Sequence, residues 1–112
     1  MCNKSYLAPH VDSQRKFLSL MLYMPDNDGK DKDYGTSFWK SNDFNYNNKH
    51  LVEKKELEKF KLKNKIFYKT PFESNCLYGF IRNDLSWHSV EPLDIYSNYV
   101  RKSINIYINY LN

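Results

Sequence analysis

The residue types and spacing near the start of the chain suggest a metal site. His10 and Asp12 are two positions apart, so on an extended strand the imidazole and the carboxylate point to the same side and can bind one ion. A second imidazole is available at His88. Two histidines and one carboxylate form the facial ligand set that holds Fe(II) and leaves the opposite coordination positions open for reactants. Zinc accepts the same ligands, so the spacing alone does not identify the metal.

A candidate anion-binding pair, Arg101 and Ser103, follows His88 along the chain. Polar and apolar residues alternate from residue 101 to residue 109, which predicts a strand with one polar and one apolar face. Arg101 and Ser103 share the polar face, where a guanidinium can bind one carboxylate of a small dicarboxylate through two hydrogen bonds and the hydroxyl adds a donor. Lys102 is a rival anchor, although the alternation points it to the apolar face. That face carries Ile104, Ile106 and Ile108.

Short β-favouring segments separated by turns must position these residues, and they predict a mainly β protein. A segment at 51–62 instead mixes leucine and phenylalanine with lysine and glutamate, which predicts a short exposed helix or an ordered insertion. We expect it to lie within an insertion at 41–64 of a single domain that spans residues 1–112, because a chain of this length has room for one domain. The predicted strands cover residues 16–24, 35–40, 66–72, 76–82 and 101–111.

Composition and charge exclude several classes of protein. Aromatic residues at 17% and charged residues at 27% indicate a folded chain, and no run approaches the roughly 18 apolar residues that a membrane span needs. The net charge of +4 comes mostly from lysines at 49–65, a stretch that also holds glutamates, so we expect a solvated face. Cys2 and Cys76 are too few for a disulfide framework, which favours a reducing cytoplasm. We therefore expect a cytoplasmic protein with neither a nucleic-acid nor a membrane partner.

Several conspicuous side chains have simpler explanations than chemistry. His50 lies in the charged stretch, and we expect it to face solvent without a role. Aromatic residues in or beside predicted strands are more often core than binding surface. The expected core residues of this kind are Tyr23, Phe38, Tyr78 and Trp87.

The ordered set of H-x-D, a distal histidine and R-x-S resembles the 2-oxoglutarate and Fe(II)-dependent oxygenases, in particular their prolyl-hydroxylase-like and phytanoyl-CoA-hydroxylase-like branches. The resemblance extends over nearly the whole chain. It is carried by PHVDS at 9–13, KFLSLMLYM at 16–24, GTS at 35–37, NCLYGFIRND at 75–84, SWHSVEP at 86–92 and RKS at 101–103. It implies a double-stranded β-helix, or jelly roll, which we expect to be partial here.

The resemblance also implies roles for the candidate residues. Its metal ligands fall on His10, Asp12 and His88, which would hold Fe(II). Its contact to the distal carboxylate of 2-oxoglutarate falls on Arg101, with Ser103 as a helper. The implied activity is that of a dioxygenase, which hydroxylates an unactivated C–H bond while 2-oxoglutarate is decarboxylated to succinate. The substrate would be a small molecule or a peptide, and ascorbate would be a candidate additional cofactor.

The chain departs from the family pattern at its start, where nine residues precede His10 instead of a substantial region of helices and a first strand. The apolar face of the last strand would then need another layer, so we expect self-association or a partner that covers it. Two other functions stay open. One is a truncated, non-catalytic metal-binding β-barrel that serves as an interaction module. The other is a metal-dependent cupin such as an isomerase, whose activity would not depend on Arg101.

Overall fold

Seven strands and one helix form in the part of the chain that the structure describes, namely residues 6–26, 34–42, 51, 53–91 and 100–111. In this computed structural model the strands are β1 (Leu7–His10), β2 (Lys16–Tyr23), β3 (Ser37–Lys40), β4 (Lys65–Lys69), β5 (Leu77–Ile81), β6 (His88–Val90) and β7 (Ser103–Asn109). The helix is α1 (Lys54–Lys63). The prediction of a mainly β protein is confirmed, and of the two alternatives for residues 51–62, a short helix or an ordered insertion, the structure has a helix. None of the described residues belong to a helix with the length and apolar character needed to span a membrane.

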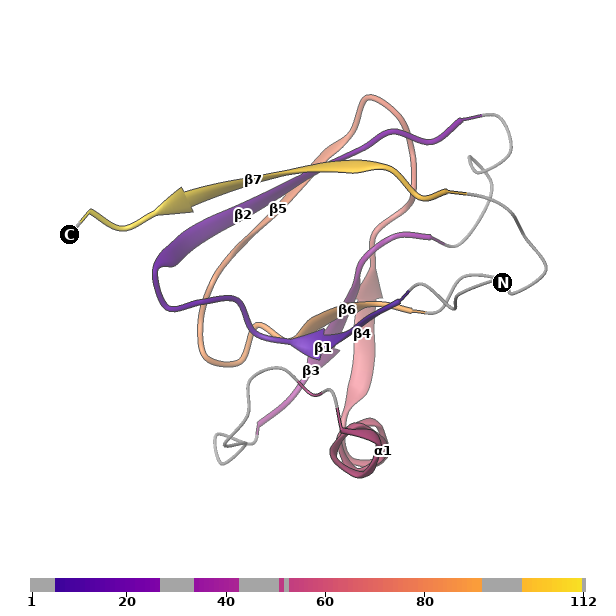
Figure 1. Cartoon of the computed structure of the whole chain (residues 1–112), viewed down its shortest axis with the longest axis vertical. Coiled ribbons are helices and arrows are strands. Elements are labelled where there is room, and N and C mark those ends of the chain that lie inside the picture. Colours follow the sequence, from indigo (N-terminus) through magenta and orange to yellow (C-terminus); the bar gives the residue numbers. More distant parts are fainter. Residues whose placement is uncertain (1–5, 27–33, 43–50, 52, 92–99, 112) are drawn as a thin grey trace.

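The strands form two antiparallel sheets, which lie one above the other in Figure 1. One sheet has the order β1-β6-β3-β4 and the other has the order β5-β2-β7. Apart from β3 and β4, consecutive strands lie in different sheets, so the chain passes back and forth between the two layers. The described strands leave both sheets open at their edges and form no closed barrel. Helix α1 lies beyond the four-stranded sheet, on the side away from the three-stranded one (Figure 1).

Alternating side chains give β2 and β7 an inner and an outer face. The two strands pair antiparallel, with Ser19 opposite Tyr107 and Leu20 opposite Ile106. Ser19 is buried, whereas Ile106 on the outer face is 46% exposed. This two-faced strand is the one that the sequence predicts, although β7 begins at Ser103, two residues later than expected.

Two strands that the sequence did not predict, β1 and β6, complete the four-stranded sheet. They contain four and three residues, which is too short for an alternating pattern to stand out from its surroundings. The strands predicted at 35–40 and 66–72 are also shorter or shifted, at Ser37–Lys40 and Lys65–Lys69. Strand ends are the least certain part of any prediction from sequence, because turn and strand residues overlap in type.

Helix α1 is anchored by one buried side chain, Phe60. Its ring centroid lies 4.8 Å from that of Trp87 and 5.3 Å from that of Trp39. The predicted helix started too early, because Leu51 is not helical. Its side chain is buried in the same apolar cluster, and its backbone N–H donates to the carbonyl oxygen of Pro9 at 3.2 Å. The connection before α1 is thereby tied to β1, the strand that carries His10.

A second apolar cluster lies around Tyr23 on β2 and stabilises the opposite part of the molecule. Among the expected core residues, Tyr23 and Trp87 are buried, and Phe38 and Tyr78 are partly buried and pack against this cluster. Cys76 is a free thiol of intermediate exposure. The remaining expectations for single residues, those for Cys2 and His50, fall outside the described residues.

Candidate metal centre

His10, Asp12 and His88 lie together where β1 ends and β6 begins. Antiparallel pairing of β1 with β6 places His10 opposite His88, and Asp12 follows two residues after the end of β1. The Oδ1 atom of Asp12 lies 3.5 Å from Nε2 of His10 and 3.5 Å from Nε2 of His88. One potential ligand atom from each residue lies within 4.8 Å of the other two. The structure thus brings together the three residues that the sequence singled out as metal ligands.

The backbone determines which nitrogen of each histidine faces the cluster. Nδ1 of His10 lies 2.9 Å from the carbonyl oxygen of Ala8, and Nδ1 of His88 lies 2.9 Å from that of Ser86. A carbonyl oxygen only accepts hydrogen bonds, so each Nδ1 carries the hydrogen. Nε2 of each ring therefore faces Oδ1 of Asp12, to which it donates a hydrogen bond when it carries a hydrogen, and without that hydrogen its lone pair is available to an ion. This is how metal-binding histidines are commonly oriented, with the second nitrogen bonded to a backbone or carboxylate acceptor.

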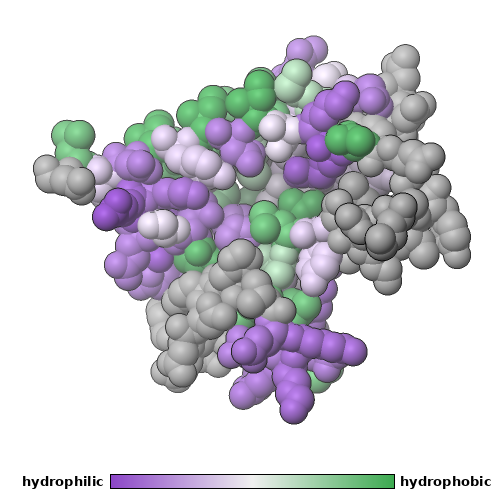
Figure 2. Space-filling view, in the orientation of Figure 1, coloured by the Kyte–Doolittle hydropathy of each residue, from purple (hydrophilic) through white to green (hydrophobic). Residues whose placement is uncertain are grey.

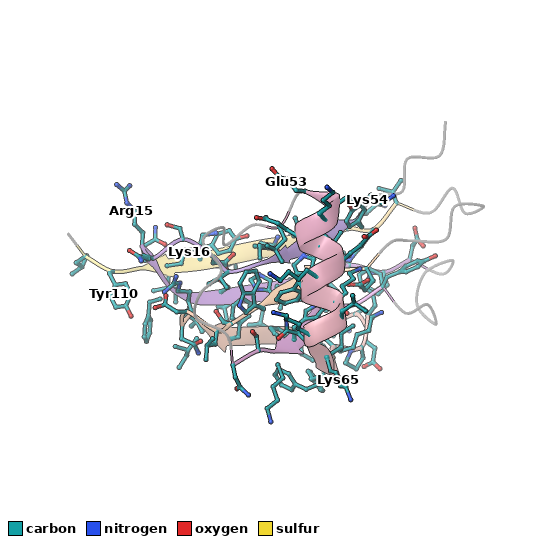
Figure 3. All side chains as sticks on the ribbon, turned by 90° about the horizontal axis from the view of Figure 1, so that it is seen from below. Arg15, Lys16, Glu53, Lys54, Lys65 and Tyr110 are labelled. Atoms are coloured by element: carbon teal, nitrogen blue, oxygen red, sulfur yellow. The ribbon has the colours of Figure 1, made fainter. Side chains whose placement is uncertain are left out.

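Asp12 is 8% exposed and is held from several sides. The hydroxyl of Ser19 donates to Oδ2 at 2.7 Å, which leaves Oδ1 to face the two imidazoles. The ammonium group of Lys16, labelled in Figure 3, lies 3.8 Å from Oδ1. Nε of Arg82 donates to the backbone carbonyl of Asp12 at 3.0 Å and restrains the chain just after β1. The carboxylate is therefore positioned before any ion binds.

Two opposing effects act on the pKa of Asp12. Burial disfavours the charged carboxylate and by itself raises the pKa. Hydrogen bonds with His10, His88 and Ser19 favour the carboxylate and together outweigh burial, so the pKa lies well below its ordinary value of 3.8. Asp12 is thus ionised at neutral pH, in the form that binds a cation.

The donor set fits a transition-metal ion. Two imidazole nitrogens and a carboxylate oxygen bring electron-pair donors together in a buried place, and a cation between them offsets their mutual repulsion. Metal–nitrogen and metal–oxygen bonds are about 2.0 to 2.2 Å long, so one ion can contact both atoms of each 3.5 Å pair. Calcium and magnesium prefer oxygen ligands alone, whereas imidazole suits iron, zinc, copper and nickel. The cluster can hold a metal ion of the latter kind.

A cavity beside the three residues also reaches Arg101. It contains about 440 Å³ of empty space, part of it open to solvent, and it is lined by all three candidate ligands and by Arg101. The apolar side chains of Met21 and Phe80 contribute to its walls. A small anion inside it can therefore be near the metal cluster and the guanidinium at once.

Arg101 is held at this cavity by a backbone carbonyl and by aromatic rings. Its Nε donates to the carbonyl oxygen of Tyr34 at 2.6 Å, and its Nη1 lies 3.5 Å from Oγ of Ser103. Its guanidinium carbon lies 5.2 Å from the ring centre of Tyr23, within the range of a cation–π contact. Lys102, the rival anchor, is exposed and does not line the cavity, which agrees with the strand alternation. Ser103 contacts Arg101 but is itself outside the cavity lining.

Hydroxyl groups that the sequence did not single out form a network beside Arg101. The hydroxyl of Tyr23 lies 2.7 Å from Oγ1 of Thr36 and 2.7 Å from Oγ1 of Thr70, and the backbone N–H of Thr36 donates to Oγ1 of Thr70 at 2.8 Å. Thr36 also lines the cavity. Ser19, the partner of Asp12, could have been found from the alternation of β2, because it shares the inner face with Tyr23.

Comparisons with models of protein families, with curated proteins and with solved structures found no match. Three features of the centre determine what it can do chemically: the donor set, the orientation of both imidazoles and the cavity shared with Arg101.

Proposed function

We propose that this chain is a non-haem Fe(II), 2-oxoglutarate-dependent dioxygenase that hydroxylates a small molecule or a peptide. The observation that carries the proposal is one cavity lined both by the three metal-ligating residues and by Arg101. Two histidines and one carboxylate leave part of the coordination sphere of an ion open to a chelating cosubstrate. A guanidinium in the same cavity is a suitable partner for the second carboxylate of that cosubstrate. A site that held only a structural ion would need no such anchor.

Each residue has a defined task in this proposal. His10, Asp12 and His88 hold the ion from one side, and the backbone carbonyls at the two Nδ1 atoms keep the imidazoles oriented. Arg101 binds the distal carboxylate of 2-oxoglutarate, and its contact with the ring of Tyr23 restricts its movement. When bound, Fe(II) with 2-oxoglutarate supplies the oxidising chemistry that transfers an oxygen atom from dioxygen to a C–H bond.

The walls of the cavity serve the same chemistry. Met21 and Phe80 limit the entry of water, which strengthens the electrostatic contact between Arg101 and a bound carboxylate. Thr36 adds a hydroxyl at the lining, and this hydroxyl donates to Sδ of Met21 at 3.2 Å.

A partial double-stranded β-helix is part of the same proposal. Jelly rolls contain eight strands in two sheets. The passage of consecutive strands between a four-stranded and a three-stranded sheet supports this type of winding. The pairing of β1 with β6, which places His10 opposite His88, also supports it.

The release of succinate tests the proposal. The full chain, supplied with Fe(II), 2-oxoglutarate, ascorbate and air, should convert 2-oxoglutarate to succinate slowly even without a substrate. Exclusion of dioxygen should stop the reaction, and the His88→Ala variant should be inactive in air. Succinate formed equally by wild type and His88→Ala would contradict the proposal, because the source would then be a contaminant or another site.

A non-catalytic metal-binding interaction module is the second candidate. The exposure of the aliphatic residues on β7, such as Ile104 at 47% and Ile106 at 46%, favours it, since an exposed apolar face indicates a surface for a partner. Tight binding of metal with no succinate from correctly folded protein would select this function over the first.

A further inference from the structure

Strand β7 is the last strand of the three-stranded sheet on one side. It pairs with β2 on one side, and no other strand among the described residues pairs with its other side. In Figure 3 it lies at the margin of the three-stranded sheet. Such an edge presents unpaired backbone donors and acceptors and is a template for another strand.

The hydrogen bonds to β2 show which groups point outward from this edge. The backbone N–H of Met24 donates to the carbonyl of Lys102 at 3.0 Å, and the register from there along β7 places Leu22 opposite Ile104 and Leu20 opposite Ile106. In an antiparallel pair, alternate residues bond to the partner strand. Even-numbered residues of β7 therefore bond to β2. The N–H and C=O groups directed away from the sheet belong to Ser103, Asn105, Tyr107 and Asn109.

The edges formed by the other outer strands have features that discourage strand addition, and β7 has none of them. β1 contains Pro9, which lacks an N–H group, and β4 begins with Lys65 and ends with Lys69. β5 has Gly79 at its centre. Prolines, lysines and interruptions of this kind are how proteins protect sheet edges. From Ser103 to Asn109, β7 has no charge, no proline and no glycine.

The sequence of β7 is also symmetric in character about Ile106. Reading outward from this residue, Asn105 corresponds to Tyr107 and Ile104 corresponds to Ile108. Two copies aligned antiparallel across a two-fold axis at Ile106 would overlap along the whole strand. The pairs Asn105–Tyr107 and Ser103–Asn109 would then exchange the outward hydrogen bonds, in agreement with the direction of these groups.

We infer that the occupant of this edge is a second copy of the chain, joined through antiparallel pairing of β7 with β7 about Ile106. The pairing places isoleucines opposite isoleucines and brings no like charges together. The pairing also joins the exposed aliphatic side chains on the outer faces of the two copies into one continuous surface. This hydrophobic surface follows the side of the molecule that β2, β5 and β7 occupy (Figure 2). The inference does not depend on the proposed function, since no metal ligand takes part.

A cysteine at the two-fold axis tests the register. Opposed residues in a non-hydrogen-bonded antiparallel pair have Cα atoms about 4.5 Å apart, within the range of about 4.4 to 6.8 Å that disulfides span. In the full chain with Cys2→Ser and Cys76→Ser, the variant Ile106→Cys should form a covalent dimer under mild oxidation. Ile104→Cys alone should not form a covalent dimer, because residue 104 of one copy lies opposite residue 108 of the other copy and far from its residue 104. An equal mixture of Ile104→Cys and Ile108→Cys should form the mixed dimer.

Sedimentation of uncrosslinked protein provides the second test. Wild type should be a dimer at micromolar concentration, and Ile106→Lys, which places two ammonium groups face to face, should raise the dissociation constant at least tenfold. Ile81→Lys is the matched control, because Ile81 is exposed on the outer face of β5 at the opposite edge and should leave the dimer intact. A wild-type monomer at high micromolar concentration would overturn the inference. A dimer that Ile106→Cys fails to crosslink, or that Ile81→Lys disrupts equally, would overturn it in favour of stacking between outer faces.

Discussion

His10 and His88 face each other across the paired strands β1 and β6, with ring centroids 4.2 Å apart and ring planes inclined by 53°. Two residues that are far apart in the sequence thereby lie side by side in the fold. Each imidazole bonds through Nδ1 to a backbone carbonyl and directs Nε2 toward Asp12. The pairing of two short strands thus brings the candidate metal ligands His10 and His88 together.

Removal of either imidazole should abolish tight metal binding. His88→Ala leaves two of the three ligands, and its effect should exceed the roughly 10- to 100-fold loss that follows removal of a residue that only orients a ligand. Anaerobic calorimetric titration with Fe(II) measures this directly. His50→Ala, which changes the third histidine of the chain, is the control and should bind as wild type does. Equal affinities in all three proteins would place the metal elsewhere.

Ser19 should increase the affinity for the metal by holding the carboxylate of Asp12 in position. Ser19→Ala removes the 2.7 Å hydrogen bond to Oδ2 and frees the carboxylate to rotate, so the affinity for Fe(II) should fall by about 10- to 100-fold. The same titration measures the change. Ser13→Ala is the matched control, because Ser13 is exposed and its hydroxyl accepts a hydrogen bond from the backbone of Arg15 instead. If the two variants behave alike, the hydrogen bond to Asp12 does not position the ligand.

Substitution of Arg101 should weaken the binding of 2-oxoglutarate and leave the binding of the metal unchanged. Loss of a charge-assisted contact is worth about 2 to 3 kcal/mol, which corresponds to a fall in 2-oxoglutarate affinity of roughly 30-fold to more than 100-fold in Arg101→Ala. Binding of 2-oxoglutarate to the Fe(II)-loaded protein, followed by calorimetry, measures it. Lys102→Ala is the neighbouring control and should change little. The opposite pattern would mean that Lys102 is the anchor.

The lowered pKa of Asp12 makes a prediction about stability and pH in the metal-free protein. Because the folded state depresses this pKa, ionised Asp12 stabilises the fold at pH values above the unfolded pKa, about 3.9, and this contribution is lost as the pH falls toward the folded pKa. Asp12→Asn should therefore reduce the free energy of unfolding at pH 7 and have a smaller effect near pH 3. Urea unfolding with a chelator present measures both values. Asp84→Asn, which removes a carboxylate that is more than half exposed, should have little effect at either pH. A difference that grows on acidification contradicts the assignment.

Phe60 is the buried side chain through which α1 packs against the apolar core. Phe60 is fully buried between Trp39 and Trp87, so Phe60→Ala should lower the free energy of unfolding by about 3 to 5 kcal/mol. Leu62 on the same helix is 89% exposed, and Leu62→Ala should change the free energy of unfolding by no more than about 0.5 kcal/mol. Urea denaturation separates the two results, and similar values would show that α1 is not packed through Phe60.

Much of the three-stranded sheet could be predicted from the sequence, because β2 and β7 are long enough for their alternation to be seen. The alternation predicted from residue 101 onward put Arg101 and Lys102 on opposite faces, and of the two only Arg101 lines the cavity. The four-stranded sheet was harder to predict, since β1 and β6 are short and derive their extended form from pairing with each other. Leu51 was assigned to the helix for a similar reason: its apolar character fits the helical pattern, but tertiary contacts with the core determine its place.

The centre itself was predicted only in part. The spacing of His10 and Asp12 and the presence of a distal histidine suggested the three ligands. The residues that orient them, Ser19 and the carbonyls of Ala8 and Ser86, come from three separate segments. Ala8 and Ser86 lie two residues before the histidines that they contact, and alternation along β2 indicates the inner face for Ser19, but only the folded arrangement shows that the three segments meet at one site.

Anaerobic absorption spectroscopy tests the central proposal most directly. Addition of 2-oxoglutarate to the Fe(II)-loaded protein in the absence of dioxygen should produce a weak metal-to-ligand charge-transfer band in the visible range, because the cosubstrate chelates the ion at its open positions. The band should be absent in His88→Ala and should need a much higher concentration of 2-oxoglutarate in Arg101→Ala. Correctly folded, Fe(II)-loaded wild-type protein that gives no band at any concentration of 2-oxoglutarate would contradict the assignment of this chain as a 2-oxoglutarate-dependent dioxygenase.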